Sequence, residues 1–195
     1  MDKTKIAEFF NRLSTGWDAQ LETDGAKIHE ILDVAGVRSG LSVLDIACGT
    51  GVLFDYYLGR DAEHITGVDI SEGMLGEAKK KYAENSRVEL ILADAEEYSF
   101  PEKYDCCMVF NAFPHFCEPE RLLKNLKAAL KDGGTLTVAH DWGRAALDEH
   151  HKNEASDVSC GLMASGELEK LFTSCGFRDI YCKENEGIYI VSGIK

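Results

Sequence analysis

The sequence predicts an α/β protein with a Rossmann-like, doubly wound sheet that is mostly parallel and ends in an antiparallel edge hairpin. From residue 42 onward, short and nearly continuous apolar runs alternate with helical patterns, which is typical of parallel strands covered on both faces. A glycine-rich turn, Cys48-Gly49-Thr50-Gly51, directly follows the first of these runs. Only residues 184–186 separate the last two runs, and this is too short for a crossover helix.

Two helices are predicted ahead of the sheet. Residues 2–13 carry apolar side chains at helical spacing, and residues 23–35 do the same before Gly36 ends the pattern. The predicted strands then follow in chain order at residues 42–47, 64–70, 88–93, 104–111, 135–140, 177–183 and 187–194. Four helices are predicted between these strands. The first ends near Leu58, and the second begins after the capping residue Ser71. The other two cover residues 119–130 and 166–175.

The length of 195 residues fits a single domain, residues 1–195, with a sizeable core. Within it we expect a helical lid in residues 1–38, a ligand-binding core in residues 42–141 and a closing helix and hairpin in residues 166–195. Residues 142–165 have the least regular pattern, and we expect a loop over the sheet there.

Composition narrows the class of partner. The net charge of -13 repels phosphate backbones, so we expect no nucleic-acid substrate. No apolar run approaches the roughly 18 residues of a membrane span, and the N-terminus lacks the apolar stretch of a secretory signal. We therefore expect a cytoplasmic protein that does not bind membranes. The seven cysteines include no Cys-x-x-Cys pair and indicate reduced thiols.

The glycine turn indicates a ligand site, because ligands of open α/β sheets bind beyond the carboxyl ends of the strands. Gly49 and Gly51 let the backbone approach a ligand closely. A dinucleotide site would need a third glycine where Phe54 stands, and a phosphate-binding P-loop would need a lysine in the turn. Both of these cofactor classes are therefore disfavoured.

S-adenosylmethionine fits the same turn better, because it carries an ammonium and a sulfonium but no phosphate. We expect Asp69, at the end of the second strand, to accept hydrogen bonds from both ribose hydroxyls. Asp94 ends the third strand and can accept from the adenine amino group, with the Ala95 N–H nearby. Asp45 can hold the loop and help to neutralise the amino-acid end of the ligand.

Taken together, these motifs resemble the class I S-adenosylmethionine-dependent methyltransferase family of the small-molecule type. The matching stretches are residues 43–51, 67–71 with Met74, 93–95, 104–111 and 133–136, in the order of the family. Ala47 stands where many members have glycine, and Phe9-Phe10-Asn11 with Gly16-Trp17-Asp18 resembles the helical lid over the cofactor. The resemblance implies that the cofactor site also includes the residues Trp17, Ala47, Thr50, Ile70, Met74 and Asn111. At helical spacing, Met74 is equally compatible with a core position.

The loops expected around the methyl acceptor are rich in histidine. His115 follows the fourth strand, His140 ends the fifth, and His151 lies in the irregular segment beyond it. Three interpretations remain open. The first is a base or hydrogen-bond donor for the substrate, with His140 or His115 as the best candidate. The second is a metal site formed by the three histidines, with or without Asp141, and the third is a structural role for loop histidines. Cys48, Cys117 and Cys160 also leave open a thiophilic acceptor such as arsenic.

The resulting functional hypothesis is methyl transfer from S-adenosylmethionine to a small-molecule acceptor by in-line displacement, with His115, His140 and His151 as the candidate catalytic residues. Two alternatives remain. One is a metal-dependent or metal-binding methyltransferase that uses the histidines, and the other is a non-catalytic protein that binds the cofactor.

Overall fold

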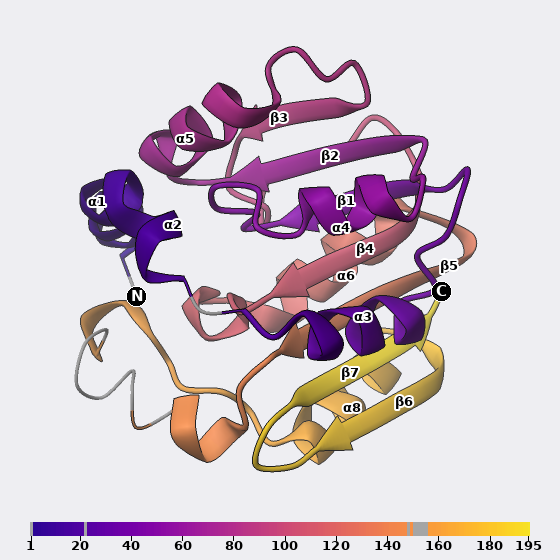
Figure 1. Cartoon of the computed structure of the whole chain (residues 1–195). Helices are drawn as coiled ribbons and strands as arrows, with labels where there is room; N and C mark the ends of the chain where they lie inside the picture. The colour runs from indigo at the N-terminus through magenta and orange to yellow at the C-terminus, as the bar shows by residue number, and fades with distance from the viewer. Residues whose placement is uncertain (1, 22, 148, 150–155) are drawn as a thin grey trace.

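A computed structural model describes residues 2–21, 23–147, 149 and 156–195. His151 lies outside the described residues. The seven strands form one sheet in the order β3-β2-β1-β4-β5-β7-β6 (Figure 1). Their bounds are β1 Ser42–Ile46, β2 His64–Asp69, β3 Val88–Leu92, β4 Tyr104–Phe110, β5 Leu130–His140, β6 Arg178–Glu184 and β7 Tyr189–Ile194.

The sheet is parallel from β3 to β5, and β7 pairs antiparallel with both β5 and β6. This confirms the predicted doubly wound sheet with an antiparallel C-terminal edge. The chain runs outward from β1 to β2 and β3, then returns to the other side of β1 with β4. Strand order therefore reverses between β1 and β4, and such a reversal opens a crevice at the carboxyl ends of the strands.

Helices cover both faces of the sheet. Alternate residues of the central strands point to opposite faces, so that Val43 joins one core cluster and Leu44 the other. The helices α3 (Gly25–Val34), α4 (Phe54–Gly59) and α5 (Glu72–Tyr82) pack with Val43, whereas α6 (Pro119–Ala129) and α8 (Ser165–Ser174) pack with Leu44. The second predicted N-terminal helix, α3, is therefore part of the sheet core and not part of a lid.

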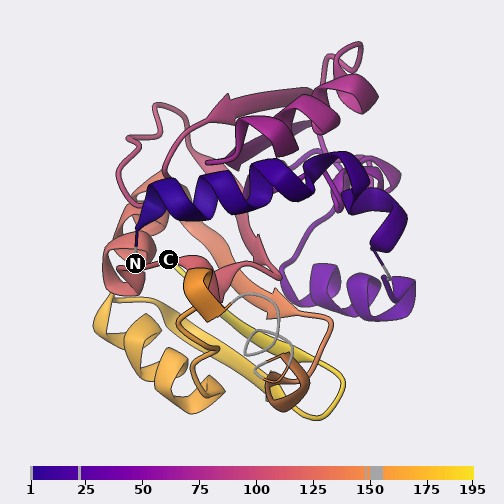
Figure 2. The same ribbon diagram turned by 90° about the vertical axis from the view of Figure 1, so that its left-hand side faces the viewer.

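The other N-terminal elements lie elsewhere. Helix α1 (Lys3–Leu13), the 3-10 turn η1 (Ser14–Gly16) and the short helix α2 (Trp17–Gln20) lie across the carboxyl ends of the strands (Figures 1 and 2). We call residues 3–20 the lid segment. Asp2 caps α1 through its side chain, which accepts a hydrogen bond from the backbone N–H of Thr4 at 2.9 Å.

Some local structure differs from the sequence-based expectation. Strand β5 begins at Leu130 rather than at residue 135, because Leu130 pairs with Tyr104 across a register shift. Residues 144–147 are helical, and 3-10 turns occur at η2 (Phe113–His115) and η3 (Ser156–Val158). In the described part of the chain, no helix is both long and apolar enough to cross a membrane.

Candidate functional site

A cavity of about 530 Å³ lies between the lid segment and the carboxyl ends of the parallel strands. Its walls are mainly apolar and aromatic, with contributions from Phe9, Phe10 and Trp142. The loops after β1, β2, β3, β4 and β5 all contribute to it, because parallel strands bring their carboxyl ends to one edge of the sheet. Its size suits a small organic cofactor together with part of a second molecule.

The turn after β1 is built from left-handed backbone. Ala47 has a φ of 53°, Gly49 of 57° and Gly51 of 82°. Ala47 and Gly49 line the cavity. A Cβ at Gly51 would lie 2.9 Å from ring atoms of Phe54 and Tyr82. Phe54, which stands where a dinucleotide site would need a third glycine, therefore packs against the turn itself. Gly51 shapes the turn without lining the cavity.

Two carboxylates lie buried at the ends of adjacent strands. Asp45 on β1 and Asp69 on β2 both line the cavity, with exposed fractions of 2% and 7%. Burial, together with the charge of Asp69, raises the pKa of Asp45 to about 8, while the Tyr57 hydroxyl opposes the shift. A cationic ligand in the cavity would favour the ionised form of both carboxyls.

Asp69 is held rigidly by the backbone around it. Its Oδ2 accepts from the Gly49 N–H and its Oδ1 from the Ser71 N–H, each at 2.8 Å. Burial raises the pKa of Asp69 to about 6, and hydrogen bonds from Ser71, Gly49 and Ile70 limit the increase. The carboxylate therefore links the glycine turn to the start of α5.

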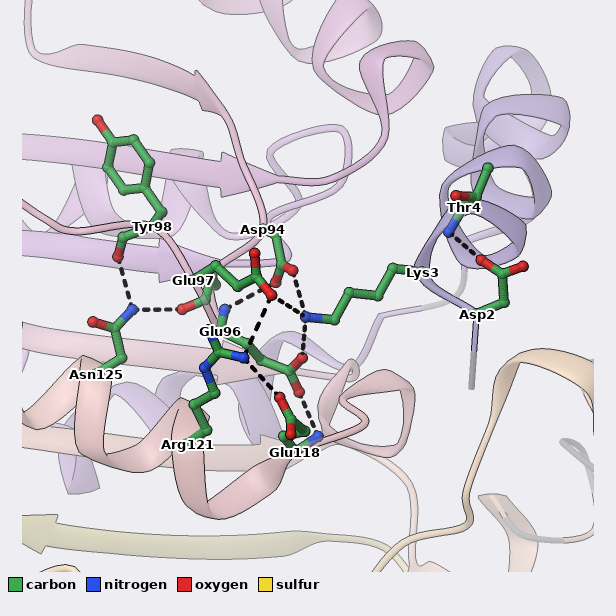
Figure 3. A network of polar contacts seen from close by, with 11 residues as sticks. Asp2, Lys3, Thr4, Asp94, Glu96, Glu97, Tyr98, Glu118, Arg121 and Asn125 are labelled. Atoms are coloured by element: carbon green, nitrogen blue, oxygen red, sulfur yellow. Dashed lines mark hydrogen bonds and ion pairs between the residues drawn. The ribbon is translucent and has the colours of Figure 1, made fainter.

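The third strand-end acid has a cation beside it. Lys3 Nζ of α1 lies 2.5 Å from Asp94 Oδ2 and 2.7 Å from Glu96 Oε2 (Figure 3). Glu96 is 3% exposed and its Oε1 accepts from the Glu118 N–H at 2.6 Å. Sequence reasoning missed both Lys3 and Glu96. They meet only in the folded chain, and no local motif marks them.

Two further polar contacts fasten the lid segment to the same motifs. Asn11 Oδ1 accepts from Ser71 Oγ at 2.7 Å and from the Gly73 N–H at 2.8 Å. Thr50 is completely buried and does not line the cavity, and its Oγ1 donates to Asp18 Oδ1 at 2.5 Å. Lys81 Nζ contacts the other oxygen of Asp18 at 2.8 Å.

The remaining predicted cofactor residues also lie at the cavity. The group comprises Trp17, Ile70, Met74, Ala95 and Asn111. Trp17 packs edge-on against Phe10, with ring centroids 5.9 Å apart. Asn111 has a φ of 51°, and its Nδ2 donates to Asp141 Oδ1 at 2.8 Å. Met74 is 1% exposed, so it contributes to the core as well as to the cavity wall.

The candidate histidines do not gather at one place. His115 lines the cavity, whereas His140 is completely buried outside it, with its ring 5.9 Å from that of Tyr189. Among the residues that the structure describes, no group of three His, Cys, Asp or Glu side chains has an arrangement suited to a metal ion. The arrangement of the described residues thus gives the metal interpretation no support.

Sequence comparisons agree with the geometry. A methyltransferase-domain family matches residues 43–134. The chain is 30% identical over 155 residues to the malonyl-[acyl-carrier protein] O-methyltransferase of Priestia megaterium, covering 77% of this chain and 56% of that protein. It is 32% identical over 145 residues to the ubiquinone/menaquinone biosynthesis C-methyltransferase UbiE of Yersinia pestis, covering 68% and 57%. The chain therefore spans little more than half the length of these relatives.

Solved structures share the fold. A phosphoethanolamine N-methyltransferase of Haemonchus contortus, in complex with phosphomonomethylethanolamine and S-adenosylhomocysteine, has a TM-score of 0.80 at 18% identity, over 100% of this chain and 61% of that one. The complex of DhpI with S-adenosylhomocysteine has a TM-score of 0.74 at 17% identity, over 98% and 95%. A chain of a complex that contains the Haloferax volcanii methyltransferase activator has a TM-score of 0.79 at 18% identity, over 95% of this chain and 96% of that one.

Proposed function

Because the chain belongs to the class I S-adenosylmethionine-dependent methyltransferase family, we propose that it binds S-adenosylmethionine in the 530 Å³ cavity and transfers the methyl group to a small molecule. The acceptor approaches from the side of the loops after β4 and β5. The protein acts in the cytoplasm, and its net charge of -13 argues against a nucleic-acid substrate.

The pair of buried carboxylates beside the glycine turn carries this proposal. Asp45 and Asp69 line the cavity, and burial raises the pKa of both. Such a site disfavours an anion and suits a ligand with positive charge. S-adenosylmethionine carries an ammonium and a sulfonium and no phosphate, so its positive charges complement these two carboxylates.

Each predicted cofactor residue then has a proposed role. Asp69 accepts from the ribose hydroxyls, and Asp94 with the Ala95 N–H faces the adenine. Ile70 and Met74 supply apolar contact to the adenosine moiety. Asp45, Ala47, Gly49 and Asn111 surround the amino-acid end, and Trp17 covers the ligand from the lid segment. Thr50 and Gly51 act through the shape of the turn and its contact with Asp18.

Catalysis in this scheme rests mainly on alignment. When bound, S-adenosylmethionine supplies an electrophilic methyl group on a sulfonium. The chain's own part is to hold the two reactants in line and to exclude water through the aromatic residues of the lid segment.

The acceptor is proposed to be small and free of phosphate. The names of the relatives differ, from a malonyl-[acyl-carrier protein] O-methyltransferase to a ubiquinone/menaquinone biosynthesis C-methyltransferase, and one structural neighbour is in complex with phosphomonomethylethanolamine. Of the described residues that line this cavity, only Lys3 is a lysine or arginine, and Asp94 and Glu96 already neutralise it. A phosphorylated acceptor would find no further lysine or arginine among them.

Calorimetry of the full chain with S-adenosylmethionine and S-adenosylhomocysteine tests the proposal. We expect binding of both, and a loss of at least tenfold in affinity for Asp69→Ala, because the ribose contacts are removed. Asp132→Ala is the matched control, since Asp132 lies exposed at the start of β5. Absence of binding at millimolar ligand would contradict the proposed function.

A further inference from the structure

We propose that the methyl acceptor is an amine on an apolar body, and that the carboxylate of Asp141 binds the nitrogen that receives the methyl group. The inference rests on the proposed function, because it needs S-adenosylmethionine as the methyl donor. It deepens that function by naming the chemical class of the acceptor and the residue that recognises it.

Asp141 lies on the acceptor side of the cavity. It directly follows β5, and β4 separates β5 from β1 and the glycine turn. Asn111, at the end of β4, lies between the turn and Asp141. Asp141 lines the cavity, although only 3% of its surface is exposed. A cofactor whose amino-acid end lies beside the glycine turn therefore leaves Asp141 to the second ligand.

The contacts of Asp141 leave one of its carboxylate oxygens for a ligand. Oδ1 accepts from Asn111 Nδ2 at 2.8 Å, and the backbone oxygen accepts from Lys27 Nζ at 2.8 Å. In the described part of the chain, Oδ2 has no hydrogen-bond partner from another residue, yet it is not among the fully buried polar atoms that lack a partner. Oδ2 thus keeps open surface, and the cavity is the open space that Asp141 lines.

The electrostatics around this carboxylate favour a positively charged group as its partner. Burial raises the pKa of Asp141, and hydrogen bonds from Asn111 and from its own backbone N–H, with the charge of Lys27, limit the increase. Asp24 acts in the same direction as burial. A cation that reaches Oδ2 would stabilise the ionised carboxylate. Lys27 cannot take this place in the cavity, because it contacts the backbone oxygen and does not line the cavity.

The cavity walls suit an apolar body that carries a cationic nitrogen. Phe10, Phe116 and Trp142 all line the cavity, and Trp142 is 42% exposed, which places it at the mouth. Aromatic rings bury apolar carbon and attract ammonium groups to their faces. An alkoxide or phenolate acceptor would instead bring negative charge beside the buried carboxylate of Asp141.

The charge balance of methyl transfer to an amine agrees with a carboxylate at this place. The N–H of the neutral amine donates to Oδ2, and its lone pair forms the bond to the methyl carbon. The carbon–sulfur bond breaks with its electron pair going to sulfur, so the positive charge passes from sulfur to nitrogen and no proton has to move in this step. The carboxylate offsets the charge as it develops on nitrogen.

Two matched probes test the proposal on the full chain saturated with S-adenosylhomocysteine. N-methylbenzylamine is a cation at neutral pH and imitates the methylated product, and benzyl methyl ether has nearly the same shape without the charge. In NMR titrations we expect a dissociation constant at least tenfold lower for the amine than for the ether. Equal affinities, or no binding of either probe up to its solubility limit, would overturn the proposal.

Asp141→Asn tests whether this carboxylate causes the preference, because the amide keeps the shape and an oxygen that can accept from Asn111. We expect the variant to lose at least tenfold in affinity for N-methylbenzylamine and to bind the ether as before. Its affinity for S-adenosylhomocysteine should stay within about threefold of wild type, which also shows that it folds.

Glu186→Gln is the matched control, because it removes the same charge near the same end of β5. The Glu186 backbone oxygen would lie 2.4 Å from a Cβ at Gly143, but Glu186 itself is exposed and does not line the cavity. This variant should keep the preference for the amine.

Three results separate the possible failures. If Asp141→Asn keeps the preference, the general negative charge of the cavity attracts the amine, and the proposal is wrong. If the variant weakens S-adenosylhomocysteine binding at least tenfold and leaves both probes unchanged, Asp141 belongs to the cofactor site, and the proposal is wrong as well. If the wild-type chain binds neither S-adenosylmethionine nor S-adenosylhomocysteine, the proposed function itself has failed, which is a separate result.

Discussion

At the scale of single residues, the most informative groups are the buried carboxyls of Asp45 and Asp69. An acid whose pKa is raised on folding binds its proton more tightly in the folded state, so stability falls as the pH rises through the interval between the unfolded and folded values. For Asp69 this interval ends at about pH 6, and for Asp45 at about pH 8. Above these pH values the ligand-free protein carries buried negative charge that destabilises the fold, and a cationic ligand would offset it.

Asp45→Asn should therefore stabilise the ligand-free protein more at pH 8 than at pH 5. The difference in free energy of unfolding between variant and wild type should grow by on the order of 1 kcal/mol per pH unit and level off above pH 8. Urea denaturation at several pH values measures it, and Asp69→Asn should level off near pH 6 instead. A difference that does not change with pH would show that Asp45 has an ordinary pKa.

Ala47 offers a second test at this scale, because it adopts a φ of 53° that glycine tolerates without strain. In Ala47→Gly, relief of that strain offsets the greater entropy of the unfolded chain, so we expect stability within about 0.5 kcal/mol of wild type. Ala128→Gly, at an exposed position of α6, should lose about 1 kcal/mol. A larger loss at residue 47 than at residue 128 in thermal denaturation would contradict this account.

The sequence predicts site residues well where one local pattern carries them. Asp45, Asp69 and Asp94 could be found because each lies in or just after an apolar strand, and the topology of a parallel sheet brings strand ends together. Lys3 and Glu96 could not be found from the sequence, because they lie 93 positions apart, in α1 and in the loop after β3. No sequence motif links the two residues. His115 could be named but not chosen over His140, since only the fold shows which of them reaches the cavity.

At the scale of elements, α1 is fastened to the loop after β3 by an ion pair with one buried partner. The Glu96 side chain is 1% exposed, and that of Lys3 is 29% exposed. Partial burial lowers the pKa of Lys3, but contact with Asp94 and Glu96 outweighs it and raises the pKa overall. Removing the ammonium would leave a buried carboxylate beside Asp94 without its cation.

Lys3→Met should accordingly lower the free energy of unfolding by about 1–3 kcal/mol. Lys5→Met is the matched control on the same helix, because Lys5 is exposed, and its effect should stay within about 0.5 kcal/mol. Urea denaturation measures both, and adding Glu96→Gln to Lys3→Met should restore part of the loss. Equal effects at the two lysines would show that the ion pair does not stabilise the fold.

Some boundaries of helices and strands can be predicted from local sequence patterns, and others cannot. The hairpin of β6 and β7 follows from a linker too short for a helix, which is a steric argument that needs no tertiary information. The early start of β5 at Leu130 follows instead from pairing with Tyr104 on a neighbouring strand. The turns η2 and η3 depend on contacts between residues 114–115 and 158–160, and no periodicity in either segment signals them.

At the scale of the whole molecule, the lid segment contacts each of the three motifs proposed to hold the cofactor. Asp18 contacts Thr50 of the glycine turn, Asn11 contacts the start of α5, and Lys3 contacts the loop after β3. A ligand in the cavity would touch both the lid segment and these motifs, because all of them line it or flank it. Lid closure and cofactor binding should therefore stabilise one another.

Hydrogen exchange measured by mass spectrometry tests this coupling. At S-adenosylhomocysteine concentrations about 100 times the dissociation constant, local opening of the lid segment should be up to roughly 100-fold rarer, and α1 amides should exchange correspondingly more slowly. Helix α8 is the internal control, because none of its residues lines the cavity, and it should change little at short exchange times. Asn11→Ala removes the bonds to Ser71 and Gly73 and should speed exchange of α1 in the ligand-free protein. Unchanged exchange of α1 on ligand binding would mean that the lid segment does not close over the cofactor.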